Sequence, residues 1–224
     1  MRILIVEPHP DDTALSAYNI VKHLVRTNPE EVYLVSLFNS VNRDSIAWCA
    51  KMGVKYIGIS MLPDYTETKK FIPHTKYKNM KDFLKEQLEW YTDIVGNINL
   101  AKFQHMLQQH INILKPAVVM SVVGIRHKAH VATRYLLDNI LDGYGVQRAY
   151  FAEYPYSSRK YAKELLSTLP LPFELFPPGG LKKMDLFWET YPSERRMFLY
   201  DAGTTSDCPE VIYFQDSLKP LFTA

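Results

Sequence analysis

"ILIVEPHPDDTALS", residues 3–16, joins a run of branched apolar residues to a histidine, two aspartates and a series of small residues. The run from Ile3 to Val6 is typical of a strand that is buried on both faces. From Ala14 to Arg26 the apolar residues recur at helical spacing, so a helix is expected there. A buried strand that leads through a polar turn into a helix is the first unit of an α/β sheet.

The alternation of strand and helix continues along the chain. Further strands are expected at 31–40, 54–60 and 117–123, and further helices at 44–52, 82–95, 103–114 and 131–141. This order predicts an α/β, Rossmann-like fold with a mostly parallel sheet and helices on both faces. The proline-rich stretch from Leu169 to Gly180 predicts a loop-rich C-terminal region. We expect one domain over residues 1–224, with an insertion at about 63–99.

Composition limits the classes of partner. The 26 basic and 24 acidic side chains nearly cancel over 224 residues, so nucleic acid is not indicated as a partner. Cys49 and Cys208 are far apart, which argues against a disulfide framework and a cysteine zinc site and predicts a cytoplasmic protein. No window approaches the roughly 20 apolar residues of a membrane span. Nothing in the composition sets the oligomeric state.

Two charged segments, "HPDD" and "RHKAH", each follow an expected strand. In open α/β sheets ligands bind beyond the carboxyl ends of the strands, so both segments are expected at one end of the sheet. There His9, Asp12 and His130 can each offer a donor atom to a cation. Two histidines and a carboxylate with an open position are typical of catalytic zinc, and ferrous iron accepts the same set.

The two remaining polar residues suit acid–base chemistry. Asp11 can act as general base toward water, and His127 can protonate the leaving amine or stabilise an oxyanion. A plainer interpretation remains open for both segments. Asp11 or Asp12 can cap the following helix, and a histidine pair three residues apart at a helix start is often only solvated.

Four blocks of the chain resemble the LmbE-like, or PIG-L, family of zinc-dependent N-deacetylases. The first is "VEPHPDDTAL", which is similar to the family's strand followed by HPDDE, and the second is "HINILKPAVVMSVVGIRHKAHVATRYLLDNIL", which is similar to its HPDH block. "YFAEYPYS" resembles the family's acidic residue before a Pro-Tyr pair, and "KKMDLFWETYPSERRMF" resembles its late helix start. The blocks occur in the family's order and cover most of the chain.

The resemblance implies His9, Asp12 and His130 as zinc ligands, Asp11 as general base and His127 as the residue that stabilises the tetrahedral intermediate. These are the roles that the chemistry of the residues also suggests.

The resemblance further implies that an arginine after the second strand and an aspartate after the third hold sugar hydroxyls. Arg43 and Asp64 are the nearest candidates.

Two positions depart from the family's pattern. Thr13 stands where the family has glutamate, and Ala129 where it has the aspartate of HPDH, so His127 lacks an adjacent acidic partner. Glu153 is a candidate replacement that could support His127 or form a structural ion pair.

The sequence therefore predicts a metal-dependent hydrolase that removes an N-acetyl or similar N-acyl group from an amino-sugar conjugate such as one of N-acetylglucosamine. A non-catalytic sugar- or nucleotide-binding protein on the same scaffold is the alternative. A metal-dependent glycosyltransferase ranks lower, because it leaves both histidines without a role.

Overall fold

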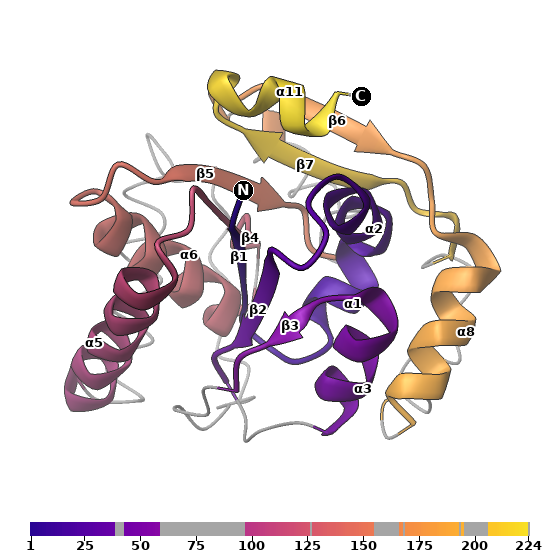
Figure 1. Ribbon diagram of the computed structural model, residues 1–224, viewed down its shortest axis with the longest axis horizontal. Helices are drawn as coiled ribbons and strands as arrows, with labels where there is room; N and C mark the ends of the chain where they lie inside the picture. Colours follow the sequence, from indigo (N-terminus) through magenta and orange to yellow (C-terminus); the bar gives the residue numbers. More distant parts are fainter. Residues whose placement is uncertain are drawn as a thin grey trace.

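The central element of the fold is a mixed β-sheet with helices on both faces (Figure 1). The computed structural model describes residues 1–38, 43–58, 97–125, 127–154, 166–167, 169–192, 194 and 206–223. The strands are β1 (Ile3–Glu7), β2 (Val32–Ser36), β3 (Lys55–Tyr56), β4 (Val118–Val122), β5 (Gln147–Phe151), β6 (Phe173–Phe176) and β7 (Glu210–Phe214). The helices are α1 (Asp12–Ser16), α2 (Tyr18–Thr27), α3 (Arg43–Met52), α5 (Asn97–Leu114), α6 (Lys128–Leu141), α8 (Gly180–Thr190) and α11 (Lys219–Phe222), with a 3-10 turn at Asp216–Leu218.

The strand order places the ends of β1 and β4 side by side. Across the sheet the order is β3-β2-β1-β4-β5-β7-β6; β1 to β5 pair in parallel, and β7 pairs antiparallel with both β5 and β6. After β1 the chain crosses over to β2 on one side, whereas after β4 it crosses to β5 on the other. A crevice at such a switch point is where open α/β sheets bind ligands. The α/β, Rossmann-like fold is confirmed.

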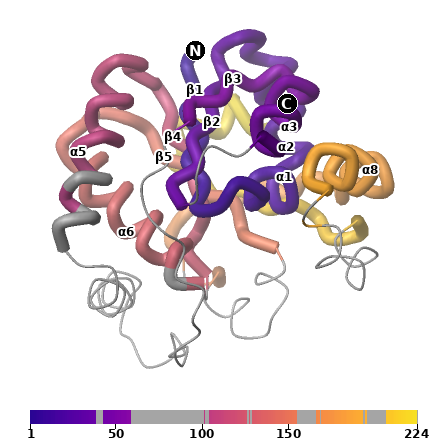
Figure 2. Tube along the Cα trace, turned by 90° about the horizontal axis from the view of Figure 1, so that it is seen from below, coloured from indigo at the N-terminus to yellow at the C-terminus, as the bar shows by residue number. Residues whose placement is uncertain are grey.

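Alternate residues of β1 enter two separate cores. Ile3 and Ile5 pack with residues of α2, α3 and α8, whereas Leu4 and Val6 pack with residues of α5 and α6. Figures 1 and 2 show these two helical layers on opposite sides of the strands. Since all four side chains are fully buried, β1 is held on both faces and its carboxyl end is a fixed point for the turn that follows.

Several expected elements differ from the structure. The single helix expected at 14–26 is two helices with a break at Ala17, whose φ of −138° is not helical. Part of the proline-rich stretch forms β6, whose alternately exposed residues mark a half-buried edge strand. β7 was not expected. The strand expected at 54–60 is observed at Lys55–Tyr56, and the helix expected at 82–95 lies outside the described residues, as does most of the 63–99 insertion.

None of the helices in the described part of the chain is long and apolar enough to cross a membrane.

A buried ion pair ties α8 to β7 and to the start of α2. The Lys183 ammonium lies 3.4 Å from a Glu210 oxygen, both side chains are buried, and the second Glu210 oxygen accepts hydrogen bonds from the backbone N–H groups of Asn19 and Ile20. Burial raises the pKa of Glu210 to about 7 and lowers the pKa of Lys183. The Glu210 carboxylate and the Lys183 ammonium therefore stabilise each other's charge inside the protein.

Lys183→Met is expected to cost about 3 kcal/mol of unfolding free energy, because it leaves a carboxylate buried without its cation. The folded-state pKa of Glu210 lies above its ordinary value, so the stability linked to its proton is lost as pH rises through about 7. Removing the Lys183 ammonium raises the pKa of Glu210 further, so ionising Glu210 at high pH costs the variant more stability than wild type. The loss of unfolding free energy in Lys183→Met should thus be larger at about pH 8 than at about pH 6 in urea titrations. Lys182→Met, an exposed change on the same helix, is the control, and equal losses at both pH values would contradict the assignment.

Candidate functional site

The turn after β1 is held in place by two helices. The backbone N–H of His9 donates to a carboxylate oxygen of Asp12 at 2.8 Å, which closes the turn. The Pro10 carbonyl accepts hydrogen bonds from the Tyr191 hydroxyl at 2.6 Å and the Ser45 hydroxyl at 3.1 Å. Since these two residues come from the end of α8 and from α3, the turn is fixed relative to both.

The turn after β4 presents two histidines at the start of α6. Gly124 has a φ of +90°, and a Cβ there would lie 3.1 Å from the Arg134 side chain, so this sharp turn favours glycine. His127 is the N-cap residue of α6, and its Nδ1 accepts a hydrogen bond from the backbone N–H of Ala129 at 3.3 Å. His130 is one turn further along and is buried. Because His127 Nδ1 accepts the hydrogen bond from Ala129, the proton of the neutral His127 ring is on Nε2.

The two turns bring two imidazole nitrogens and the Asp12 carboxylate together. His9 Nδ1 lies 3.2 Å from His130 Nε2 and 3.2 Å from one oxygen of Asp12, and the other Asp12 oxygen lies 3.2 Å from His130 Nε2. Tetrahedral zinc with bonds of about 2.0–2.1 Å requires neighbouring donor atoms about 3.3–3.4 Å apart. The three residues therefore offer ligands of the type that zinc takes, and each of these contacts is close to that spacing, although a different Asp12 oxygen lies near each nitrogen.

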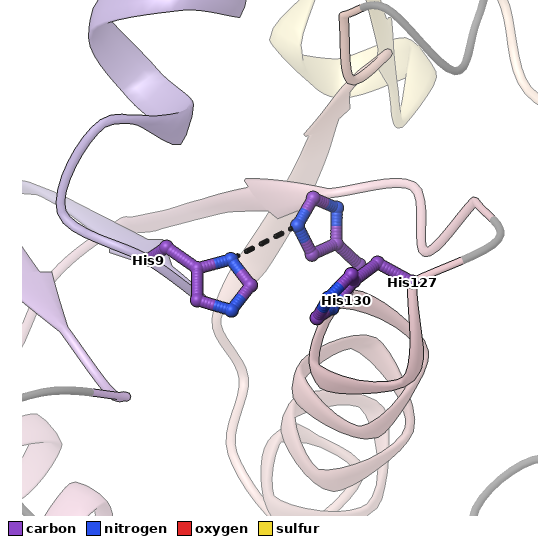
Figure 3. A group of neighbouring side chains, drawn as sticks. All are labelled: His9, His127 and His130. Atoms are coloured by element: carbon purple, nitrogen blue, oxygen red, sulfur yellow. Dashed lines mark hydrogen bonds between the residues drawn. The ribbon is translucent and has the colours of Figure 1, made fainter. Parts of the chain in front are cut away.

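His127 completes a cluster of three imidazoles. Its ring centroid lies 4.8 Å from that of His9 and 5.1 Å from that of His130, and one nitrogen of each ring falls within 4.8 Å of the others (Figure 3). This histidine cluster could hold a metal ion. The contacts of the Asp12 oxygens with His9 and His130 are shorter than 4.8 Å, at 3.2 Å each, so the carboxylate lies in direct contact with two of the three histidines.

The charges at the donor atoms are strongly coupled. Burial disfavours the Asp12 carboxylate, but the neighbouring His130 and His9 rings outweigh this and hold the pKa of Asp12 well below its usual range. Burial likewise disfavours charge on His130, but Asp12 and Glu153 raise the pKa of His130 to about 9. Without a cation the cluster therefore retains a proton, which a metal must displace.

Asp11 occupies the N-cap position of α1, yet among the described residues its side chain makes no capping hydrogen bond. This disfavours the helix-cap interpretation for Asp11. Burial and the adjacent Asp12 carboxylate raise the pKa of Asp11 to about 7, against a smaller lowering by His9. A carboxylate with a pKa near neutral is suited to accept a proton from water.

Two further buried carboxylates support the turns that carry the histidines. Glu7, fully buried, accepts hydrogen bonds from the Thr13 backbone N–H at 3.0 Å and the Ser36 hydroxyl at 2.6 Å. Burial raises the pKa of Glu7 to about 8. Glu153, also fully buried, contacts His130 rather than His127, as Nδ1 of His130 lies 3.2 Å from its carboxylate. The structure therefore favours the ion-pair alternative for Glu153, with His130 as the partner.

The two candidate sugar-binding residues are not brought into the cluster by any contact in the described structure. Arg43 is exposed at the first position of α3. Asp64 lies outside the described residues. Sequence reasoning missed Glu7, Ser45 and Tyr191 as supports of the turn. Only Glu7 carried a signal, because an acid at the end of a buried apolar run needs partners.

No known sequence family matches the chain, and no curated protein matches it in sequence. Solved structures do match. A deacetylase from the biosynthesis pathway of teicoplanin shares 15% identity with a TM-score of 0.62, covering 96% of this chain and 99% of its own. The A40926 pseudoaglycone deacetylase Dbv21 shares 15% identity with a TM-score of 0.60, covering 95% and 96%.

A zinc-inhibited form of the teicoplanin deacetylase Orf2 matches with 14% identity and a TM-score of 0.60, covering 96% of this chain and 98% of its own. The chain therefore has the deacetylase fold over almost its whole length, and the fold that the LmbE-like resemblance implies is confirmed. At the switch point of this fold the chain places a histidine cluster that could bind a metal.

Proposed function

We propose that this protein is a zinc-dependent hydrolase that removes an N-acyl group, such as acetyl, from an amino sugar carried on a larger molecule. The observation that carries this proposal is the set of 3.2 Å contacts among His9, Asp12 and His130 at the switch point of the sheet. Two histidines and a carboxylate leave a coordination position open, as hydrolytic zinc sites require. The similarity of the fold to glycopeptide deacetylases supports the reaction class.

The proposed ligands are His9 Nδ1, Asp12 and His130 Nε2. A zinc ion held there would supply Lewis acidity, which would polarise an amide carbonyl and lower the pKa of water toward about 7. Ferrous iron suits the same ligands. Zinc is the first choice because two histidines and one carboxylate with an open position are typical of catalytic zinc.

Two residues of the chain handle protons and charge in the proposed reaction. Asp11 accepts the proton of the attacking water, since its pKa of about 7 leaves much of it ionised at neutral pH, and this proton then passes to the amine nitrogen as the C–N bond breaks. His127 donates its Nε2 proton in a hydrogen bond to the carbonyl oxygen as negative charge develops there. That donor is fixed because Nδ1 already accepts from the Ala129 backbone N–H.

The proposed substrate is an N-acyl amino-sugar conjugate, and the acyl group and the aglycone are to be found by screening. One similar structure is a deacetylase–teicoplanin complex, so glycopeptides belong in the screen beside small N-acetylglucosamine conjugates. Arg43 and Asp64 remain proposed contacts to sugar hydroxyls.

The test is release of carboxylic acid from N-acetyl and longer N-acyl glucosamine conjugates, measured by mass spectrometry with zinc added up to one equivalent. Excess zinc is avoided because of the zinc-inhibited relative. We expect acid release that a chelator abolishes and zinc restores. Sugar binding without acid release from any conjugate would favour the non-catalytic binding protein instead, and failure to bind zinc or iron would overturn the proposal.

A further inference from the structure

Glu153 lies two residues beyond β5 and reaches the turn after β4 from the neighbouring strand. A single oxygen, Oε1, accepts hydrogen bonds from the backbone N–H groups of Gly124 at 2.8 Å and Ile125 at 2.7 Å. The same oxygen lies 3.2 Å from Nδ1 of His130. The side chain is fully buried, so its charge has to be met by these donors.

This contact decides which nitrogen of His130 carries the proton. A carboxylate cannot donate, so Nδ1 of His130 is the protonated donor toward Glu153. In the neutral ring the lone pair then lies on Nε2, the atom 3.2 Å from both His9 Nδ1 and an Asp12 oxygen. The carboxylate thus turns the ligating face of the ring toward the other two donors.

We propose that Glu153 is a positioning residue for the metal centre: it fixes the tautomer and orientation of His130 and makes Nε2 a stronger ligand. Histidine ligands commonly donate their second N–H to a carboxylate, and losing such a partner weakens metal binding by roughly 10–100-fold. This inference rests on the proposed zinc site. It adds Glu153, which is not one of the proposed ligands, as a residue that supports one of them. The carboxylate comes from the segment after β5, so it reaches His130 independently of the residue at position 129.

A purely structural role is the competing explanation, since the two backbone hydrogen bonds alone would tie β5 to the turn after β4. Glu210 is a matched control. It is also buried, belongs to the neighbouring strand β7, accepts two backbone N–H groups, those of Asn19 and Ile20, and pairs with the Lys183 ammonium. No contact in the described part of the chain joins it to the three histidines. Glu153→Gln and Glu210→Gln each replace a buried carboxylate by an amide that can still accept hydrogen bonds.

The experiment measures zinc affinity of folded wild type and both variants by competition with a chromophoric chelator, and the visible spectrum of the cobalt-loaded forms. Glu153→Gln should bind zinc about tenfold or more weakly and shift the cobalt bands. Glu210→Gln should match wild type in both readouts. Equal affinity in all three proteins, or equal losses in both variants, overturns the claim that the Glu153 charge strengthens Nε2 as a ligand, which is the effect that an amide oxygen does not reproduce. A wild type that binds no zinc would instead overturn the proposed function.

If Glu153→Gln does not fold, nitrogen-15 NMR of the histidine rings in zinc-loaded wild type decides the question. We expect His130 with its proton on Nδ1 and its metal on Nε2. A His130 ring with the proton on Nε2 would overturn the inference.

Discussion

His130→Ala is expected to abolish zinc binding and, with it, N-deacylase activity. The change removes one of three donors and leaves the Asp12 and Glu153 carboxylates facing the vacated space. The loss of affinity should exceed the roughly 10–100-fold effect of removing an outer partner. Elemental analysis of the purified protein should therefore find near-stoichiometric zinc in wild type and almost none in the variant.

The matched control for this change is His105→Ala. His105 is an exposed histidine of α5 whose ring contacts Gln109 on the same helix, so its loss should alter neither zinc content nor turnover. Thermal unfolding of metal-free His130→Ala separates loss of the ligand from loss of the fold. A folded His130→Ala protein with full zinc content would show that the metal is held elsewhere and would remove the basis of the proposed chemistry.

The position of the site was predictable because two short polar segments follow two buried strands. In a parallel sheet the carboxyl ends of neighbouring strands meet, so His9 and His130 had to approach one another once β1 and β4 were neighbours. The spacing of Asp12 within the turn and of His127 before His130 followed from the sequence as well. The order of strands and helices therefore allowed the proximity of these residues to be predicted from the sequence.

The partners of the donors were not predictable from the same patterns. The sequence indicated Glu153 as a candidate partner of His127, but which imidazole it meets depends on how α6 is rotated about its axis. That rotation is set where His127 caps the helix and Gly124 turns the chain, both tertiary details. Glu7 meets Thr13 for a similar reason, since their contact requires the turn between them to close.

The break between α1 and α2 shows the same limit. Apolar spacing runs without interruption from Ala14 to Arg26, so the pattern predicts one helix. In the structure a second helix starts after Ala17, where the Glu210 carboxylate accepts the N–H groups of Asn19 and Ile20. A cap supplied from about 190 residues away leaves no local signal.

Asp11→Asn is expected to lower turnover by about 10²–10⁴-fold while zinc content stays near that of wild type. Asparagine matches aspartate in shape but cannot accept a proton from water at neutral pH. The metal should remain because Asp11 is not one of the proposed ligands His9, Asp12 and His130, whose side chains contact one another at 3.2 Å. Single-turnover kinetics on a conjugate found by the screen, with zinc content measured on the same preparation, provides the comparison.

The adjacent residue offers the sharpest contrast. Asp12→Asn makes the same chemical change one position along the chain, but it weakens a proposed ligand, so zinc content should fall together with turnover. The pair thus separates proton transfer from metal binding with two variants of equal size and charge. Zinc loss in Asp11→Asn, or unchanged turnover, would mean that the raised pKa of Asp11 reflects burial beside Asp12 alone. Proton transfer would then have to be assigned to another group near the histidines, and Glu194, whose charge helps to raise the pKa of Asp11, would be the next residue to replace.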